Sequence, residues 1–310
     1  MNSCRTGECR MGTANVPDEP QDQPEVVDAH HRSCASGPFA AAPSRLRQLL
    51  ELSVELAREA GGLQKTRTQG QIRVETKSSA TDLVSEVDRE SERAIVERLS
   101  AVRPDDAILA EEGTLRAGTS GVRWVIDPLD GTTNYLYGYP AFAVSIAVEL
   151  DGQARIGTVY DSSAGCCYTA LRGFGAFCED RPLKVREQSD LARSVVATGF
   201  SYDARQRELQ GEVLGAVLCR VSDIRRSGSA ALDLCHVAAG HLDAYWELDN
   251  RPWDYGAGSV IAREAGAQVL FAPAAHGRGP AVVAANSSLM PSLLVLLQEA
   301  GALAGPAFPA

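Results

Sequence analysis

The feature that most constrains this chain is an apolar segment that leads directly into two carboxylates and a glycine-threonine turn. From Trp124 to Asn134 it reads WVIDPLDGTTN. The β-branched residues at its start predict a buried strand, and Pro128 predicts the end of that strand because proline cannot donate to a sheet. Asp127 would then lie at the carboxyl edge of a sheet, where open α/β sheets bind their ligands.

The two carboxylates of this segment predict a metal and phosphate site. Gly131 can approach an anion closely because it has no Cβ, and the following threonines supply amides and hydroxyls. Carboxylates repel phosphate, so a divalent cation must lie between them, and hard oxygen ligands favour Mg²⁺. The dipeptides Asp-Pro and Asp-Gly also occur in ordinary turns. A phosphatase with an aspartate nucleophile needs a single residue between two aspartates, whereas two separate Asp127 from Asp130.

Composition and charge argue against several classes of protein. The 310 residues are 45% hydrophobic and carry a formal net charge of −10, whereas sequence-independent nucleic-acid binding needs a basic face. No apolar run approaches the roughly 20 residues that cross a bilayer, and no signal-peptide pattern begins the chain. We therefore expect a cytoplasmic protein with no membrane or direct nucleic-acid partner. The five histidines fall outside every motif discussed here, which argues against a histidine-based nucleophile system.

The two ends of the chain differ from its middle. Residues 1–43 are polar and lack a periodic apolar face, so we expect a disordered N-terminal tail, followed by a folded domain over 44–300 and a C-terminal tail over 301–310. The N-terminal tail holds five side chains that could ligate zinc, although their spacing matches no standard finger. They are Cys4, Cys9, His30, His31 and Cys34.

Apolar periodicity predicts alternating helices and strands over residues 44–300. Helices are expected at 44–60, 82–102, 203–218, 227–239, from about 253, and at 287–299, and strands at 107–110, 124–127, 142–150, 154–160, 166–171, 194–200, 244–247, 268–271 and 281–285. This order indicates a layered α/β or α+β domain. Asp88 falls on the apolar face of the second helix, where a carboxylate is costly unless it is hydrogen-bonded. The alternative is that Asp88 lies at the edge of that face and reaches water.

Acidic residues follow strands or begin helices in three separate segments. The segments are Glu111-Glu112-Gly113, the Asp127 to Asn134 stretch, and Trp253-Asp254-Tyr-Gly-Ala-Gly. In this order and at these separations they resemble the signatures of the inositol monophosphatase family. The stretch from Lys77 to Asp88 and the turn Gly228-Ser229-Ala230 resemble two further motifs of that family. The resemblance covers about residues 44–300.

The resemblance implies a five-layered αβαβα sandwich of the sugar phosphatase type, usually a homodimer. Such enzymes hydrolyse small phosphate monoesters with two to three Mg²⁺ ions and are commonly inhibited by lithium. Carried over by position, Glu111, Asp127 and the Leu129 carbonyl would hold the first ion. Asp127, Asp130 and Asp254 would hold the second, and Glu111 would serve a third ion through water.

The resemblance also implies catalytic and substrate-binding roles. Glu111 and Thr132 would orient the attacking water, with Thr132 bonded in turn to Asp88. Phosphate and the substrate hydroxyls would be contacted by Asp130, Gly131, Thr132, Gly228, Ser229, Ala230, Glu247 and Asp254. Arg251, near the rim of the expected pocket, could engage a second acidic group or face water.

The expected substrate is a small phosphorylated polyol or sugar, foremost inositol monophosphate. Histidinol phosphate and fructose bisphosphate are alternatives, whereas no obvious insertion would build the base pocket that adenosine bisphosphate needs. An alternative of another class comes from bacterial relatives that act through a surface as partners of the transcription machinery. The chain could therefore also be an antitermination partner.

Overall fold

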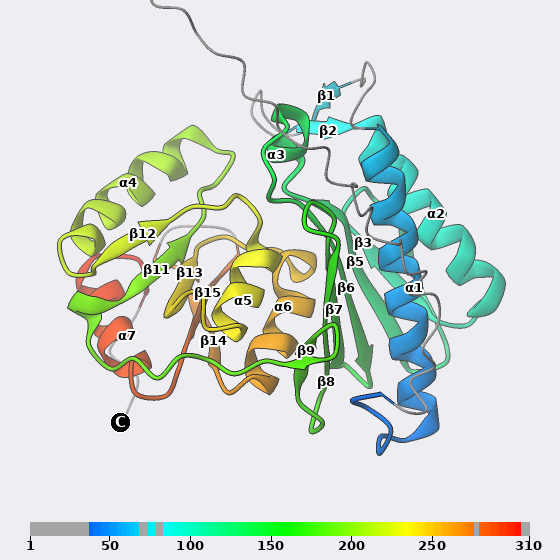
Figure 1. Cartoon of the computed structure of the whole chain (residues 1–310). Coiled ribbons are helices and arrows are strands. Elements are labelled where there is room, and N and C mark those ends of the chain that lie inside the picture. Colours follow the sequence, from blue (N-terminus) through cyan, green and yellow to red (C-terminus); the bar gives the residue numbers. More distant parts are fainter. Residues whose placement is uncertain (1–36, 68–73, 78–82, 276–278, 305–310) are drawn as a thin grey trace, which may run out of the picture. The chain divides into compact units, whose positions relative to one another are not determined.

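The structure is a computed structural model that describes residues 37–67, 74–77, 83–275 and 279–304. Within these residues the elements form five layers, which alternate between pairs of helices and two sheets (Figure 1). The layered αβαβα sandwich expected from the resemblance is thus confirmed. None of the helices in this part of the chain is long and apolar enough to cross a bilayer.

The first two layers are a helix pair and a mixed sheet. Helices α1 (Ser44–Arg67) and α2 (Glu86–Val102) pack on one face of the sheet, against its central strands. The sheet runs in the order β10-β9-β8-β7-β6-β5-β3-β4, and β3 and β5 are parallel. Its strands are β3 (Ala107–Ala110), β4 (Leu115–Arg116), β5 (Val122–Asp130), β6 (Ala143–Leu150), β7 (Gln153–Asp161), β8 (Cys166–Leu171), β9 (Ala176–Cys178) and β10 (Arg181–Pro182).

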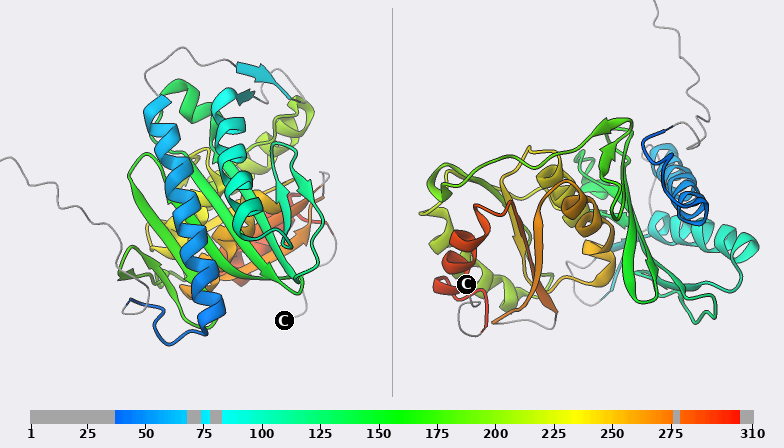
Figure 2. Two further views of the ribbon diagram at one scale, coloured as in Figure 1. Left: turned by 90° about the vertical axis from the view of Figure 1, so that its right-hand side faces the viewer. Right: turned by 90° about the horizontal axis from the view of Figure 1, so that it is seen from below.

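The remaining layers follow the second half of the chain. Helices α5 (Ala230–Ala238) and α6 (Pro252–Glu264) lie between the two sheets, as Figure 2 shows, and α4 (Ala204–Leu218) and α7 (Met290–Glu299) cover the outer face of the second sheet. That sheet has the order β12-β11-β13-β15-β14. Its strands are β11 (Val195–Thr198), β12 (Asp223–Arg225), β13 (Ala244–Glu247), β14 (Gln268–Pro273) and β15 (Pro280–Ala285). A single 3₁₀ turn at Leu191–Arg193 precedes β11.

Helix α1 is longer than the sequence predicts. It continues through Gly61 and Gly62 to Arg67, although two successive glycines usually favour a helix end. A Cβ on Gly61 would lie 2.3 Å from the ring of Tyr160 on β7. This glycine therefore allows α1 to pack closely on the sheet and does not end the helix.

Helix α2 begins later than predicted. Residues Leu83–Ser85 form strand β2, which pairs with β1 (Val74–Thr76), and the helix starts at Glu86 and not near residue 82. The Ser85 hydroxyl accepts hydrogen bonds from the amides of Val87 and Asp88. The Asp88 carboxylate in turn accepts a 2.8 Å hydrogen bond from the Ser85 amide. This reciprocal capping box fixes the start of α2.

The ordered chain extends beyond the expected limits of 44–300 at both ends. Phe39 is buried against the ring of Phe177, with ring centroids 5.1 Å apart, because the turn at residues 37–43 packs on the core beside α1. At the other end Ala302 and Leu303 are buried beside α7, and Leu303 forms a bridge with Ala274. Both segments are thus part of the core and not of the tails in which the sequence analysis placed them.

Candidate active site

Four acidic residues from three separate segments interact at the ends of β3 and β5 and at the start of α6. They are Glu111, Asp127, Asp130 and Asp254. Burial raises the pKa of Asp127 well above its usual range, and repulsion from the other three carboxylates raises it further. Burial also raises the pKa of Asp130, to about 6, and that of Asp254. The fold therefore brings together the acidic side chains that the sequence analysis assigned to metal binding.

A β-bulge gives Asp127 and Asp130 their positions. Strand β5 pairs with β6 at both residues, but the register shifts between them. Pro128 lies inside this bulge and does not end the strand, contrary to the prediction, because a bulge tolerates a residue without a donor. The carbonyl of Pro128 accepts a 2.7 Å hydrogen bond from the buried side-chain amide of Gln64, which ties the bulge to α1.

Gly131 turns the chain from β5 into the short helix α3 (Thr132–Tyr137). Its φ is 93°, and a Cβ would lie 2.7 Å from the carbonyl oxygen of Ala141. Only glycine fits this turn without strain. The carbonyl of Leu129, the expected main-chain metal ligand, accepts a 3.1 Å hydrogen bond from the Thr132 hydroxyl.

Asp88 is fully buried on α2 and does not reach water. One of its oxygens accepts a 2.7 Å hydrogen bond from the Thr132 hydroxyl, and the other accepts hydrogen bonds from the amide and hydroxyl of Ser85. Burial raises the pKa of Asp88, although these hydrogen bonds oppose the shift. The contact between Asp88 and Thr132 expected from the resemblance is therefore present, and the same carboxylate also caps α2.

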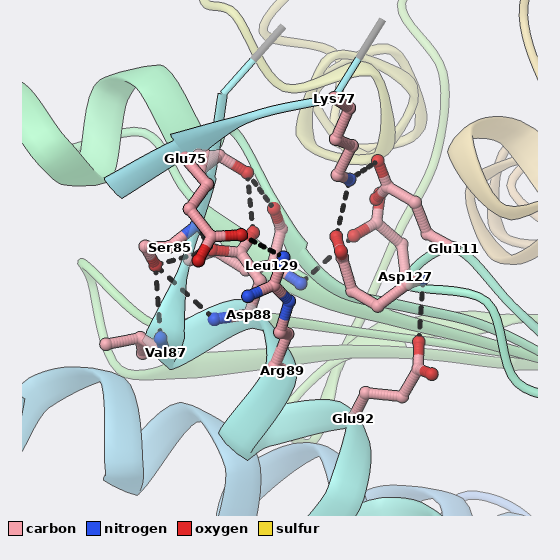
Figure 3. Close-up of polar contacts among 12 residues, drawn as sticks. Glu75, Lys77, Ser85, Val87, Asp88, Arg89, Glu92, Glu111, Asp127 and Leu129 are labelled. Carbon is pink, nitrogen blue, oxygen red and sulfur yellow. Dashed lines mark hydrogen bonds and ion pairs between the residues drawn. The ribbon is translucent and has the colours of Figure 1, made fainter. Parts of the chain in front are cut away.

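Lys77 supplies positive charge beside the acidic cluster. Its ammonium lies 2.9 Å from the Glu111 carboxylate and 2.5 Å from that of Glu112 (Figure 3). Partial burial opposes ionisation of Lys77, but the two ion pairs outweigh it and raise its pKa. Burial also raises the pKa of Glu112, to about 7. One positive charge of the protein itself therefore already contacts Glu111.

The turn at residues 227–229 is tied to the acidic cluster by several hydrogen bonds. The Ser229 hydroxyl and the Ala231 amide donate to the same oxygen of Asp130, at 2.6 and 2.8 Å. The side-chain amide of Asn134 donates to the carbonyls of Ala141 and Ser227, at 2.7 and 2.8 Å. The expected substrate-contacting turn, Gly228-Ser229-Ala230, is therefore held directly beside the Asp127 segment.

Glu247 lies at the end of β13, where the sequence analysis placed it. Burial raises its pKa to about 7, and the Tyr245 hydroxyl donates to it at 2.9 Å. Repulsion from Asp130 raises this pKa further, so the two carboxylates interact. Arg251 is exposed at the start of α6, and its main-chain amide donates to the Asp254 carboxylate at 2.6 Å.

The donor set fits a hard divalent cation, although the side chains are not arranged as a finished metal cage. Over the described ranges no group of three or more His, Cys, Asp or Glu side chains is positioned to hold a metal ion. The acidic side chains instead contact local partners. The Asp127 carboxylate accepts a 3.0 Å hydrogen bond from the Leu129 amide, and the Glu111 carboxylate accepts one from Lys77. Carboxylate oxygens are nevertheless the ligands that Mg²⁺ prefers. A cation would also relieve the repulsion that raises the pKa of Asp127.

Sequence reasoning missed several residues that brace this site. Gln64, Glu92 and Asn134 have no assigned role in the motifs, and only long-range contacts reveal them. Only Ser85, followed three residues later by Asp88, carried a detectable signal, since that spacing is typical of a capping box. The five possible zinc ligands of the N-terminal tail, from Cys4 to Cys34, lie outside the described residues.

Comparison with known proteins found similar sequences and structures. Residues 45–302 match the model of the inositol monophosphatase family. The chain is 43% identical to an inositol-1-monophosphatase of Mycobacterium bovis over 83% of its own length and 94% of the relative's. It is 41% identical to a protein of Vibrio cholerae named Nus factor SuhB, over 72% and 85% of the two lengths. The structure of Mycobacterium tuberculosis SuhB superposes with a TM-score of 0.72 at 40% identity, over 83% of this chain and 98% of that one.

Proposed function

This chain belongs to the inositol monophosphatase family, and on that premise we propose that it hydrolyses inositol monophosphate to inositol and phosphate with Mg²⁺ as cofactor. The observation that carries the proposal is the acidic group of Glu111, Asp127, Asp130 and Asp254, in which Asp127 is fully buried, adjoined by the hydrogen-bonded pair Asp88 and Thr132. Four carboxylates that repel one another in one place cost stability unless they serve a positively charged ligand.

The metal ligands are proposed from the family resemblance, position by position. Glu111, Asp127 and the Leu129 carbonyl would hold one ion, Asp127, Asp130 and Asp254 would hold another, and Glu111 would serve a third. When bound, Mg²⁺ supplies positive charge to the phosphate oxygens and to the leaving alkoxide. A phosphate monoester is dianionic, so the acidic cluster binds it only together with the cations.

The protein's own groups would orient the attacking water. The single proton of the Thr132 hydroxyl is shared in hydrogen bonds to Asp88 and to the Leu129 carbonyl, so the hydroxyl oxygen can only accept from a further partner. A water between Thr132 and Glu111 would donate one proton to each, which aims its own lone pair at phosphorus. Asp88 acts here only through Thr132, because it is fully buried.

Substrate contacts would come from two sides of the site. The amides of Gly131 and Thr132 face the phosphate, and the turn at Gly228, Ser229 and Ala230 faces the hydroxyls of the alcohol. Asp130, Glu247 and Asp254 complete this second side. Carboxylates suit a polyol because each can accept hydrogen bonds from neighbouring hydroxyls.

A phosphate-release panel tests the proposal. The full-length protein with Mg²⁺ is assayed with inositol monophosphate, fructose bisphosphate and histidinol phosphate, beside Asp127→Asn as the inactive control. We expect the highest kcat/KM for inositol monophosphate and inhibition by lithium. A higher value for either of the other two monoesters would reassign the substrate, and no release from any would reject the activity.

The named relative in Vibrio cholerae favours a second candidate function, that of an antitermination partner. This role would use a surface and not the catalytic groups. Tagged full-length protein and its Asp127→Asn variant are tested for retention of RNA polymerase and antitermination factors. Equal retention by both would support a partner role independent of catalysis, and no retention would reject it. We further propose, from the family resemblance, a cytoplasmic homodimer.

A further inference from the structure

We propose that Glu92 is a positioning residue that holds Glu111 in place for cation binding, an inference that rests on the proposed metal-dependent function. Glu92 lies on α2 and is only 5% exposed. No motif of the sequence contains it, and its carboxylate is bonded to the turn that follows β3. Its role follows from the main-chain groups to which it is bonded.

Both oxygens of Glu92 accept hydrogen bonds from the turn that carries Glu111. One accepts a hydrogen bond from the Glu112 amide at 2.8 Å, and the other accepts hydrogen bonds from the amide and hydroxyl of Thr114, at 3.1 and 2.6 Å. These donors flank Gly113, whose φ is 112°. The carboxylate of Glu92 thus binds both sides of the most flexible point of the turn.

Packing alone does not hold this turn. A groove of about 270 Å³ runs beside it, and its lining is mostly charged. It is lined by Arg89, Glu92, Arg93, Val96, Glu97, Glu112 and Thr114. Leu115, which follows the turn, is 80% exposed. With so little apolar contact on this side, the position of the turn depends on hydrogen bonds. Main-chain hydrogen bonds contribute, among them those from the Ala110 amide to the Thr114 carbonyl and from the Glu111 amide to the Ile126 carbonyl. Glu92 adds the side-chain hydrogen bonds that join the turn to α2.

Glu92 and Asp88 act from the same face of one helix. They are four residues apart on α2, so their side chains point the same way. Asp88 holds Thr132 at the end of β5, and Glu92 holds the turn after β3. The two groups that would share the attacking water, Thr132 and Glu111, are therefore positioned by a single rigid element.

A carboxylate at this position is difficult to explain by stability alone. Burying a charged group costs free energy that an apolar side chain would not require, and hydrogen bonds to amides only offset that cost. Fixing a metal ligand through its main chain is a reason to retain the charge. Groups that orient metal ligands typically contribute about 10- to 100-fold in metal affinity or activity.

The test compares Mg²⁺ binding by the full-length protein and four variants, measured by calorimetry without substrate. In Glu92→Gln the new amide nitrogen cannot accept a hydrogen bond, so we expect the Mg²⁺ dissociation constant to rise about 10-fold or more. Thr114→Val, which removes only the hydroxyl donor, should raise it less. Thr114→Ser keeps that donor, and Glu97→Gln changes an exposed carboxylate on the same helix and groove, so both should bind as the unmodified protein does.

Two further readouts separate positioning from stability. In the metal-free protein the amides of Glu112 and Thr114 should exchange with solvent faster in Glu92→Gln than in Glu97→Gln. In the active enzyme the half-saturating Mg²⁺ concentration should rise while the substrate KM at saturating Mg²⁺ stays nearly constant. If Glu92→Gln does not fold, Thr114→Val carries the same comparison.

Unchanged Mg²⁺ affinity in Glu92→Gln and Thr114→Val, with a lower melting temperature, would show that Glu92 serves stability only and would overturn the proposal. Binding of Mg²⁺ by the unmodified protein without hydrolysis of any monoester would reject the proposed function, whereas the comparison of affinities would still decide the role of Glu92. Absence of Mg²⁺ binding in the unmodified protein would overturn both.

Discussion

The hydroxyl of Thr132, at the start of α3, donates a 2.7 Å hydrogen bond to the buried carboxylate of Asp88, 44 positions earlier on α2. Asp88 also caps its own helix through Ser85. One carboxylate thus both holds Thr132, which would bind the attacking water, and fixes the start of α2. This arrangement leads to a first prediction.

Asp88→Asn and Thr132→Ala should each lower kcat by about 100-fold or more, the contribution expected when a group that orients the reacting water is lost. Because the two residues act as one unit, the double variant should be little worse than either single one. The measurement is kcat at saturating Mg²⁺ and substrate, with Glu97→Gln as the control on the same helix. Fully multiplicative losses would show that the pair does not act as a unit.

Asp127→Asn should lower hydrolysis by more than about 100-fold, since the loss of a group that only orients a metal ligand already costs up to that amount. The fold should persist. In the absence of metal the melting temperature should rise, because one of four mutually repelling carboxylates is removed. Turnover and circular dichroism melts check both parts, and near-normal turnover would contradict the two-ion assignment.

The buried carboxyl group of Asp233, which lies outside the acidic cluster, should make the stability of the fold depend on pH. Burial raises its pKa well above 3.8, and its Oδ1 atom has no hydrogen-bond partner among the residues that the structure describes. The folded state therefore keeps a proton that the unfolded state loses near pH 4, so stability falls as pH rises from about 4 to the folded pKa. Asp233→Asn should remove this loss. It should be more stable than the unmodified protein at pH 7, with the advantage vanishing near pH 4.

Urea unfolding at a series of pH values measures this effect. Asp105→Asn, at an exposed position, serves as the control. If the free energies of unfolding of Asp233→Asn and the unmodified protein differ by a constant amount across pH 4 to 8, Asp233 does not titrate in the folded state as described.

Gly131→Ala should destabilise the fold by about 1–3 kcal/mol, the cost of a left-handed backbone at a residue with a Cβ. The contact of 2.7 Å with the Ala141 carbonyl adds to this strain. Gly211→Ala is the matched control: it lies within α4, and a Cβ there meets nothing within 4 Å. It should stabilise by about 0.5–1 kcal/mol. If denaturant unfolding gives the two variants the same change in the free energy of unfolding, the turn at Gly131 relaxes to accept a Cβ.

The positions of the elements and of the acidic residues could be read from local patterns. Asp127 lies near the end of β5 and Asp254 in the first turn of α6 because apolar periodicity, proline and glycine act over a few residues. Motif order then indicated which acids belong to one site. The predicted ends of α1 and β5 were wrong, since Gly61 is needed for contact with Tyr160 and Pro128 is accommodated by a bulge.

Tertiary packing alone decided which groups hold the acidic residues. Asp130 meets Ser229 across 99 positions of the chain, and Gln64 meets the Pro128 carbonyl across 64. Glu92 looks like any other glutamate on a helix until the turn after β3 is packed against it. A hydrogen bond depends on distances of a few tenths of an ångström between segments. Those distances are set by the packing of five layers, and no local pattern of residues encodes them.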